Sequence, residues 1–333
     1  MELAALRARL EQRPRTSLAS LPTPLRTLPR LRAALGPETP ELRVKLDEET
    51  GFGLGGNKVR KLEFELAPER LTGATHLITT GGPQSNHCRV TAAAAARLGL
   101  GCVLVINGPP TSAPTGNARL HRILGAQIRH VESRAERTAA VAAAVEEVER
   151  AGGKALVIPL GASTPHGALG YVRALLELHD QLPEEPDRAV QIFVSSSSGG
   201  TLAGLWAGLA LLDRADLNIA AVSADTPGDE LREIAAKLAR GVLRLLEADP
   251  DSVERVSGRV EIDDNEVGRG YGIPTEAADE ATDLLARSEG ILLDPVYTAK
   301  AMAGMIRWLR EGRSPAGDRI VFWHTGGHPA LLK

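Results

Sequence analysis

Short apolar runs rich in β-branched residues alternate along the chain with longer amphipathic stretches. The short runs predict strands at Leu42–Leu46, Thr75–Thr79, Cys102–Ile106, Gln127–Val131, Ala155–Pro159, Val190–Val194, Ile219–Ser223, Gly290–Leu293 and Arg319–Trp323. The longer stretches predict helices at Asn86–Leu98, Gly116–Leu124, Ala135–Ala151, Ala168–Gln181, Thr201–Leu212, Asp229–Ala248, Glu276–Ser288 and Ala299–Glu311. This alternation indicates an α/β protein whose parallel sheet is covered by helices on both faces.

The composition is that of a globular protein with room for about two domains. Of 333 residues, 43% are hydrophobic and 24% are charged, and the net charge is −3. No basic stripe favours nucleic acid, no apolar run is long enough to span a bilayer, and the charged N-terminal segment lacks a secretory signal pattern. Cys88 and Cys102 are too few for a disulfide framework. We therefore expect a cytoplasmic protein with neither a nucleic-acid nor a membrane partner.

Open parallel sheets bind ligands beyond the carboxyl ends of their strands, where loops lead into helices. The first such place is Gly51–Phe64, where glycines let backbone approach a ligand and Asn57 and Lys58 open a helical pattern. A lysine at a helix start has a lowered pKa, and its neutral form reacts with a carbonyl cofactor. A glycine loop followed by a solvent lysine fits the same pattern. Lys61 is the rival, and we expect it to contact solvent or a carboxylate.

The second place is Thr79–Arg89, between a strand and an alanine-rich helix. Ser85 is positioned as the N-cap of that helix. Exposed N–H groups at a helix start also bind anions, so this turn suits a substrate carboxylate, with further hydrogen-bonding partners at Gln84, Asn86 and His87. Cys88 is interpreted as a small buried residue and not as a nucleophile.

The third place is Val194–Gly204, where a strand runs through a serine- and glycine-rich loop into an apolar helix. Backbone N–H groups of such a loop, together with the helix dipole, bind a phosphate. The loop lacks the lysine of a P-loop and the glycine spacing of a dinucleotide fingerprint. A single phosphate handle fits best, although a flexible polar turn has the same composition.

The fourth place consists of Leu293–Met302 and Phe322–Ala330, each of which follows a predicted strand. Small residues at these turns allow close approach to a flat heterocycle. His324 and His328 are spaced like metal ligands, but no third ligand is evident, and we expect no metal site. Tyr271 lies between two glycines, where it is poorly placed to pack in a core, and this favours a role in the site.

Six segments, taken together in order and spacing, resemble the family of aminocyclopropane-carboxylate (ACC) deaminase and D-cysteine desulfhydrase. They read GGNKVRKLEF, GGPQSNHCR, SSSSGGTLAG, GYGIP, DPVYTAKAM and HTGGHPAL. The resemblance runs from about Pro22 to Leu331. It implies the pyridoxal-phosphate (PLP) fold type II, similar to the tryptophan synthase β-subunit, with two three-layer α/β domains and parallel-rich sheets. The expected large domain is 1–60 plus 171–333, the expected smaller domain is 61–170, and a homodimer is implied.

The resemblance also implies roles for individual residues. The cofactor would form a Schiff base with Lys58, and the catalytic residues would be Lys58, Ser85, Tyr271 and Tyr297. The implied cofactor-binding residues are Lys58, Asn57, Asn86, Ser198, Gly199, Gly200, Thr201, Thr298 and Thr325. The implied substrate-binding residues are Ser85, Asn86, His87 and Gln84.

Two threonines distinguish activities within the family. ACC deaminases carry Glu at the position of Thr298 and Leu at the position of Thr325, and both threonines resemble the desulfhydrase pattern. A carboxylate keeps the pyridine nitrogen protonated for difficult ring opening, whereas a hydroxyl suffices when a good β-substituent leaves. We expect β-elimination of a small amino acid, most simply D-cysteine to pyruvate, hydrogen sulfide and ammonia.

Several alternatives stay open at this point. His328 and Cys88 depart from the residues usual in the family, so L-cysteate sulfo-lyase and ACC deaminase activities remain candidates. A non-catalytic PLP-binding protein is another, while the missing dinucleotide fingerprint disfavours an oxidoreductase.

Overall fold

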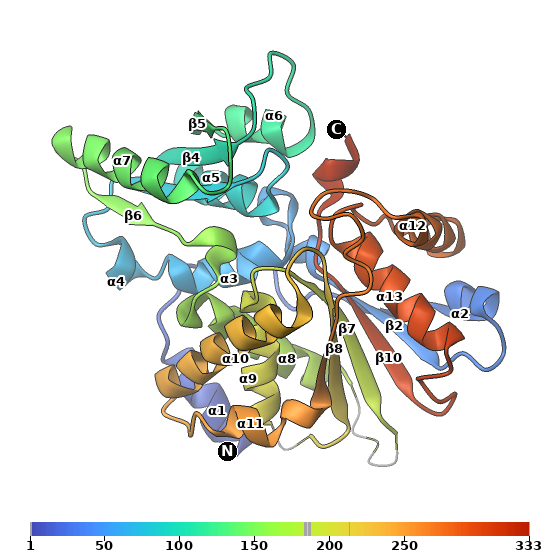
Figure 1. Ribbon diagram of the computed structural model, residues 1–333. Coiled ribbons are helices and arrows are strands. Elements are labelled where there is room, and N and C mark those ends of the chain that lie inside the picture. The colour runs from blue at the N-terminus through green and yellow to red at the C-terminus, as the bar shows by residue number, and fades with distance from the viewer. Residues whose placement is uncertain (1, 183–184, 186–187, 213, 333) are drawn as a thin grey trace.

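The computed structural model describes residues 2–182, 185, 188–212 and 214–332, which form two β-sheets flanked by helices (Figure 1). The larger sheet has the order β1–β2–β10–β7–β8–β9 and is parallel except for β1. Its strands are β1 (Leu25–Thr27), β2 (Glu41–Leu46), β7 (Val190–Ser196), β8 (Leu217–Ser223), β9 (Val260–Asp263) and β10 (Arg319–His324). The smaller sheet, β5–β4–β3–β6, is parallel throughout. Its strands are β3 (His76–Gly81), β4 (Gly101–Asn107), β5 (Gln127–Val131) and β6 (Ala155–Val157).

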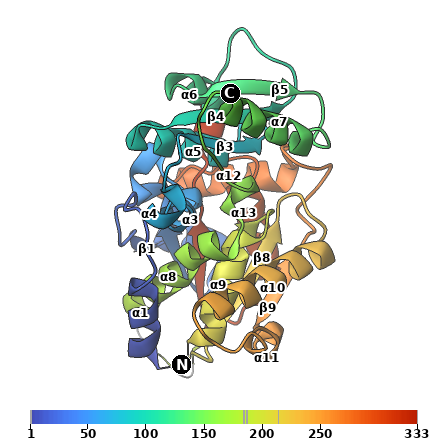
Figure 2. The ribbon, with the colours of Figure 1, turned by 90° about the vertical axis from the view of Figure 1, so that its left-hand side faces the viewer.

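Helices cover both faces of the smaller sheet. Successive side chains of a strand point in opposite directions, so each strand contributes apolar side chains to both faces. Leu77 and Cys102 pack with Cys88 in one buried cluster, while Ile78 and Val103 belong to a second cluster on the other face. The helices of this part are α5 (Asn86–Leu98), α6 (Gly116–Ile123) and α7 (Arg137–Arg150). Figure 2 shows them at one end of the molecule, away from the larger sheet.

The larger sheet is the middle layer of a second three-layer arrangement. On β7, Ile192 and Val194 face one buried cluster, and Phe193 between them faces the other. The first cluster is covered by α1 (Leu3–Glu11), α8 (Pro165–Gln181), α9 (Gly200–Leu211), α10 (Gly228–Leu245) and α11 (Ser252–Arg255). The second is covered by α2 (Pro29–Leu35), α12 (Glu276–Glu289) and α13 (Thr298–Arg310).

The remaining short elements connect the two sheets or end the chain. They are η1 (Asp47–Thr50), η2 (Phe52–Leu54), α3 (Asn57–Glu65), α4 (Pro68–Leu71), η3 (Leu160–Ala162), η4 (Ser257–Arg259) and η5 (His328–Leu332). A buried ion network fixes α3 in place. Arg60 of α3 contacts Asp47 at 2.8 Å and Glu177 of α8 at 2.9 Å, and Lys45 also bonds Glu177. Tyr171 donates its hydroxyl hydrogen to Asp47.

The eight predicted helices and most predicted strands are confirmed, but the strand predicted at Gly290–Leu293 is wrong. That segment is irregular, and the rings of His324 and His328 contact the Leu292 carbonyl where a strand would have a backbone partner. The sequence analysis also missed the short strands β1 and β9. The smaller sheet lies within 61–170, while the proposed domain boundaries stay a prediction. No described helix is long and apolar enough to cross a membrane.

Candidate active site

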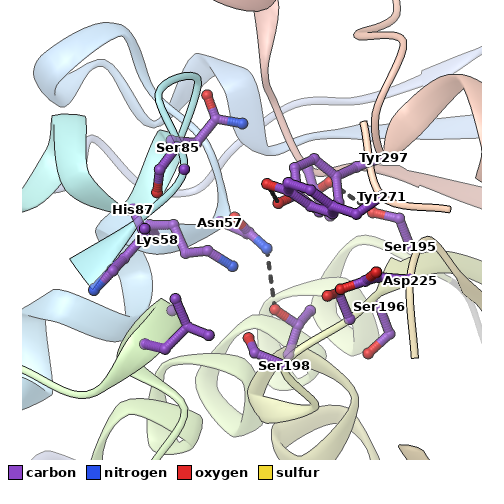
Figure 3. Close-up of a pocket in the computed structure, with 18 of the residues that line it drawn as sticks. Asn57, Lys58, Ser85, His87, Ser195, Ser196, Ser198, Asp225, Tyr271 and Tyr297 are labelled. Carbon is purple, nitrogen blue, oxygen red and sulfur yellow. Dashed lines mark hydrogen bonds between the residues drawn. The ribbon is translucent and has the colours of Figure 1, made fainter. Parts of the chain in front are cut away.

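A cavity lies where the loops after β3, β7, β8 and β10 converge with the start of α3 (Figure 3). These loops follow the carboxyl ends of parallel strands of both sheets, which is where α/β proteins bind ligands. The lining includes these residues predicted as site residues: Asn57, Lys58, Ser85, Asn86, His87, Ser198, Gly199, Thr201, Tyr271, Tyr297 and Thr325. The structure therefore brings together segments that are far apart in the sequence.

Lys58 lies in the first turn of α3, and its side chain lines the cavity. Gly55 and Gly56 set this turn, with φ of 66° and 109°, and a Cβ on Gly55 would lie 1.8 Å from the Glu48 carbonyl oxygen. Among the described residues, the Lys58 ammonium group has no hydrogen-bonding or ionic partner. Burial lowers the pKa of Lys58 to about 8. Lys58 is thus the kind of amine that reacts with an aldehyde at neutral pH.

Polar groups surround the start of α9, which is the predicted phosphate loop. Ser163 Oγ lies 2.8 Å from Ser198 Oγ and accepts hydrogen bonds from the Gly200 N–H at 3.2 Å and from Lys61 Nζ at 3.0 Å. The prediction that Lys61 contacts solvent or a carboxylate is wrong, because Lys61 is fully buried in this cluster. Asn57 donates to the Thr201 hydroxyl at 3.1 Å. A lysine, three hydroxyls and a helix N-terminus make a donor set for an anion.

Two tyrosines form another wall of the cavity. The hydroxyl oxygens of Tyr271 and Tyr297 are 2.6 Å apart, and the rings meet at 66° (Figure 3). Burial raises the pKa of both hydroxyls, so both stay protonated. One hydroxyl donates to the other, which leaves one hydroxyl hydrogen available to a ligand. The Arg134 guanidinium lies 4.8 Å from the centre of the Tyr271 ring.

Thr298 and Thr325, the two threonines compared in the sequence analysis, lie in different surroundings. Thr325 lines the cavity, and its hydroxyl lies 3.0 Å from that of Ser195. Thr298 is fully buried and does not line the cavity. Its hydroxyl donates to Asp294 Oδ1 at 2.8 Å and accepts from the Asp294 N–H, an arrangement that closes the turn into α13. Thr325 is therefore the better placed of the two for a ligand.

The turn after β3 presents Ser85 and His87 to the cavity but not Gln84. Ser85 Oγ accepts from the Cys88 N–H, as predicted for an N-cap. Thr79 gives its single hydroxyl hydrogen to the Ile158 carbonyl, so His87 Nε2, 2.8 Å from Thr79, must be the donor to Thr79. His87 Nδ1 is then a buried acceptor without a partner among the described residues.

Gln84 instead bonds the start of α6. Its side-chain oxygen accepts from the Asn117 N–H at 2.9 Å, and its amide nitrogen donates to the Thr115 carbonyl at 3.2 Å. Both ends of its amide are thus occupied outside the cavity. A substrate contact by Gln84 has no support in this geometry.

A third candidate metal ligand joins the two C-terminal histidines. Ligand atoms of Glu48, His324 and His328 lie within 4.8 Å of one another, a grouping that the sequence did not reveal. Both histidine Nε2 atoms contact the Leu292 carbonyl oxygen, at 2.8 and 3.0 Å, and Glu48 lies 3.0 Å from His324 Nδ1. Burial lowers the pKa of His324 but the Glu48 carboxylate outweighs it and raises the value. The two rings thus share one carbonyl oxygen, while Glu48 Oε2 is buried and makes no hydrogen bond among the described residues.

The chain matches known proteins over nearly its whole length. The sequence model of the family described as pyridoxal-phosphate dependent enzyme matches residues 16–326. The chain belongs to this family. Relatives of this enzyme include the D-cysteine desulfhydrases of Salmonella newport (strain SL254) and Klebsiella pneumoniae, each 40% identical over 96% of this chain and 95% of the relative. The crystal structure of an ACC deaminase homologue superposes with a TM-score of 0.88 at 34% identity, covering 100% of this chain and 97% of the other. A PLP-dependent aspartate racemase, with a TM-score of 0.66 and 16% identity, shares the fold.

The cavity of this PLP-dependent enzyme fits its cofactor in three ways. An unpartnered lysine of lowered pKa suits the aldehyde, and the cationic and hydroxyl cluster at α9 suits the phosphate. Ser196 Oγ, which is buried and lines the cavity, has no partner among the described residues, so the site has unused hydrogen-bonding capacity. The sequence signal that could have placed Lys61 at the site is its spacing: it follows Lys58 by three residues, on one helix face. No local pattern pointed to Ser163.

Proposed function

We propose that the enzyme eliminates the β-substituent of D-cysteine. D-cysteine and water would give pyruvate, hydrogen sulfide and ammonia. The curated D-cysteine desulfhydrases, similar over nearly the full length, support this substrate. The proposal of elimination rests most heavily on one observation. The groups at the Thr325 end of the cavity are two neutral hydroxyls, those of Thr325 and Ser195, which lie 3.0 Å apart.

Our proposal assigns the cofactor to three groups of residues. Lys58 would hold the aldehyde carbon, Lys61 with the first turn of α9 would hold the phosphate, and Thr325 with Ser195 would face the pyridine nitrogen. When bound, the cofactor supplies an electron sink for the pair left behind when the substrate Cα loses its proton. Asn86 would face the ring hydroxyl.

The remaining lining residues would act on the substrate itself. The carboxylate of the substrate would bind at the N-terminus of α5, where N–H groups and Ser85 converge. Lys58, once released, would take the Cα proton, with Ser85 as the rival base. The free hydroxyl hydrogen of the Tyr271–Tyr297 pair would lie beside the departing sulfur and protonate it.

Neutral hydroxyls at the pyridine end favour elimination over ring opening. Among the described lining residues the one carboxylate is Asp225, and it pairs with Arg134 at 3.0 Å. No lining carboxylate is thus free to keep a pyridine nitrogen protonated. This argues against ACC deamination, which needs the stronger electron sink.

Two arginines make cysteate a second candidate substrate. Arg134 and Arg137 line the cavity near the tyrosines. Arg137 donates to the Asn107 side-chain oxygen, while its buried Nε has no partner among the described residues. Guanidinium groups match sulfonate oxygens well, so L-cysteate would replace D-cysteine if these arginines bind the substituent.

The deciding experiment compares three substrates on one preparation. Purified enzyme is given D-cysteine, L-cysteate or ACC, and the cofactor band, keto acid, sulfide and sulfite are measured. We expect pyruvate and sulfide in equal amounts from D-cysteine, no turnover of ACC, and loss of the lysine-bound cofactor band in Lys58→Ala. Sulfite from L-cysteate alone would support the second candidate. A bound cofactor without turnover of any of the three would contradict both.

The assembly and compartment belong to the same proposal. We infer a cytoplasmic location from the sequence and a homodimer from the family resemblance. Light scattering on a size-exclusion column gives the mass directly. A monomer that retains full activity at low concentration would contradict the dimer.

A further inference from the structure

Arg89 is a buried cation of unusual surroundings. It lies on α5 with 1% of its surface exposed, and no carboxylate of the described residues pairs with it. Burial lowers the pKa of Arg89 to about 10, so the side chain is still charged at neutral pH. Burying a charge without an opposite charge costs free energy. We therefore expect the Arg89 guanidinium to have a role that a neutral side chain could not fill.

The Arg89 guanidinium determines how the Asn86 amide is turned. Arg89 Nη1 lies 2.9 Å from one end of that amide. A guanidinium has five N–H donors and no acceptor, so the amide atom facing it must be the oxygen, Oδ1. Asn117 Nδ2 donates to the same oxygen at 2.8 Å. The Asn86 NH₂ group therefore points away from both, and among the described residues it has no partner, while Asn86 lines the cavity.

The same arginine fixes Asn117 and the lysine loop. Its Nη1 also donates to Asn117 Oδ1 at 3.0 Å, which turns the Asn117 NH₂ group toward Asn86. Its Nη2 donates to the Gly55 carbonyl at 2.7 Å, three residues before Lys58. One planar group thus holds Asn86, Asn117 and the loop that carries Lys58 in fixed relation. Lysine, as a single ammonium point, cannot reach three acceptors in this fork geometry.

We propose that Arg89 is a positioning residue that presents the NH₂ group of Asn86 to the ring hydroxyl oxygen of the bound cofactor. The proposal rests on the cofactor site given under Proposed function. Asn86 alone could offer either end of its amide to the cavity. Arg89 and Asn117 together remove that choice, so the ring oxygen meets a donor and is held as an anion.

The test is a double-mutant cycle read from the cofactor spectrum. The visible band of the bound cofactor is titrated with pH in wild type, Arg89→Met, Asn86→Ala and the double variant. Without a hydrogen-bond donor, the ring oxygen is more basic and holds the proton that it shares with the nitrogen of Lys58 more tightly. The pKa read from the visible band therefore rises, by about one unit in each single variant. The double variant should shift no further than Asn86→Ala alone. Arg97→Met, an exposed arginine on the same helix, should not shift it.

Additive shifts in the double variant, or an unshifted Arg89→Met, would overturn the proposal. Should Arg89→Met not fold, Asn117→Ala removes the other donor to the same oxygen and should give a smaller upward shift, absent in an Asn86→Ala background. If Asn117→Ala then leaves the pKa of the cofactor band unchanged and Arg89→Lys titrates like wild type, Arg89 is not the positioning group. Failure of the cofactor site itself would show differently, as wild-type protein without a lysine-bound band.

Discussion

Lys58 and His87 in the cavity and Lys61 beside it all have lowered pKa values. Burial lowers the pKa of Lys58 to about 8, so a fraction of it is neutral at pH 7. Burial also lowers the pKa of Lys61 well below its ordinary value, and nearby Lys58 adds to the effect. Burial and both lysines lower the pKa of His87 well below its ordinary value, so His87 is neutral. A bound phosphate would favour the charged form of Lys61.

The lowered pKa of Lys58 predicts how fast cofactor-free enzyme captures PLP at different pH. Only neutral amine attacks the aldehyde, so the capture rate should rise about tenfold per pH unit below the pKa and level off above about 8. Stopped-flow absorbance measures the rate. Pyridoxamine phosphate, which lacks the aldehyde, is the control and should bind with a different pH dependence. A flat PLP profile between pH 6 and 9 would contradict the prediction.

At this scale the sequence predicted residue identity better than residue surroundings. Lys58, Ser85 and Tyr271 lie in the cavity because each follows a turn whose glycines or caps are visible in the sequence. Lys61 and Thr298 were placed less well. Their surroundings come from distant segments, since Ser163 lies 102 residues from Lys61 and the Thr298 hydroxyl is taken up by its own turn.

Among the elements, α3 has the most demanding position, because it carries Lys58 and lies between the two sheets (Figure 1). It is fixed to α8 and η1 by Arg60, which bonds both oxygens of Asp47 and both of Glu177. Burial alone would raise the pKa of Glu177, but Arg60 and Lys45 hold it at about 2. These contacts connect the stability of the fold to the placement of the reactive lysine.

Replacing Arg60 by methionine should destabilise the enzyme by about 3–5 kcal/mol, because buried Asp47 loses its ionic partner and Glu177 keeps only Lys45. Urea unfolding at pH 7, followed by circular dichroism, measures the change. The pKa of Glu177 is lowered in the folded state, so its stabilisation of wild type is present above about pH 4.5 and lost as pH falls toward 2. Arg287→Met, which removes an exposed i, i+4 pair with Asp283, should cost less than about 0.5 kcal/mol. Equal costs for the two variants would contradict the prediction.

Long elements with strong periodicity were predicted from sequence, and short elements at sheet edges were not. β9 spans four residues with only its two ends buried, so its pattern does not separate it from a loop. Gly290–Leu293 has the apolar composition of a strand, but Leu292 is 51% exposed. Its backbone serves the two histidine rings instead of a neighbouring strand, which no local pattern could indicate.

For the whole molecule, the decisive feature is a cavity shared by both sheets. Arg134, between β5 and α7, contacts Asp225 after β8 at 3.0 Å, so an ion pair from the two sheet systems crosses the cavity beside Tyr271. The order of the segments in the chain predicted an α/β protein with two parts. The ion pair itself depends on how the parts dock, and the sequence contained no sign of it.

Removing this ion pair should weaken substrate binding by a modest amount. Half-exposed pairs contribute about 0–1 kcal/mol, so Arg134→Gln should lower kcat/KM by no more than about fivefold, mainly through KM. At 1 M salt, wild type and variant should converge, because salt screens exposed charges. The control is Arg129→Gln, which breaks an ion pair between Arg129 of β5 and Glu147 of α7. This variant should leave the kinetics unchanged. A kcat loss that salt does not diminish would indicate a direct catalytic contact instead.

The buried pair Cys88 and Cys102 acquires meaning from the proposed reaction. Cys88 of α5 and Cys102 of β4 lie in one buried cluster, and burial raises the pKa of each thiol to about 12. Thiol–disulfide exchange and persulfide formation proceed through the thiolate and need access to it. Polysulfides, which form when released sulfide meets an oxidant such as dioxygen, would therefore find both thiols protonated and shielded. The packing around the smaller sheet thus lowers the reactivity of both cysteines.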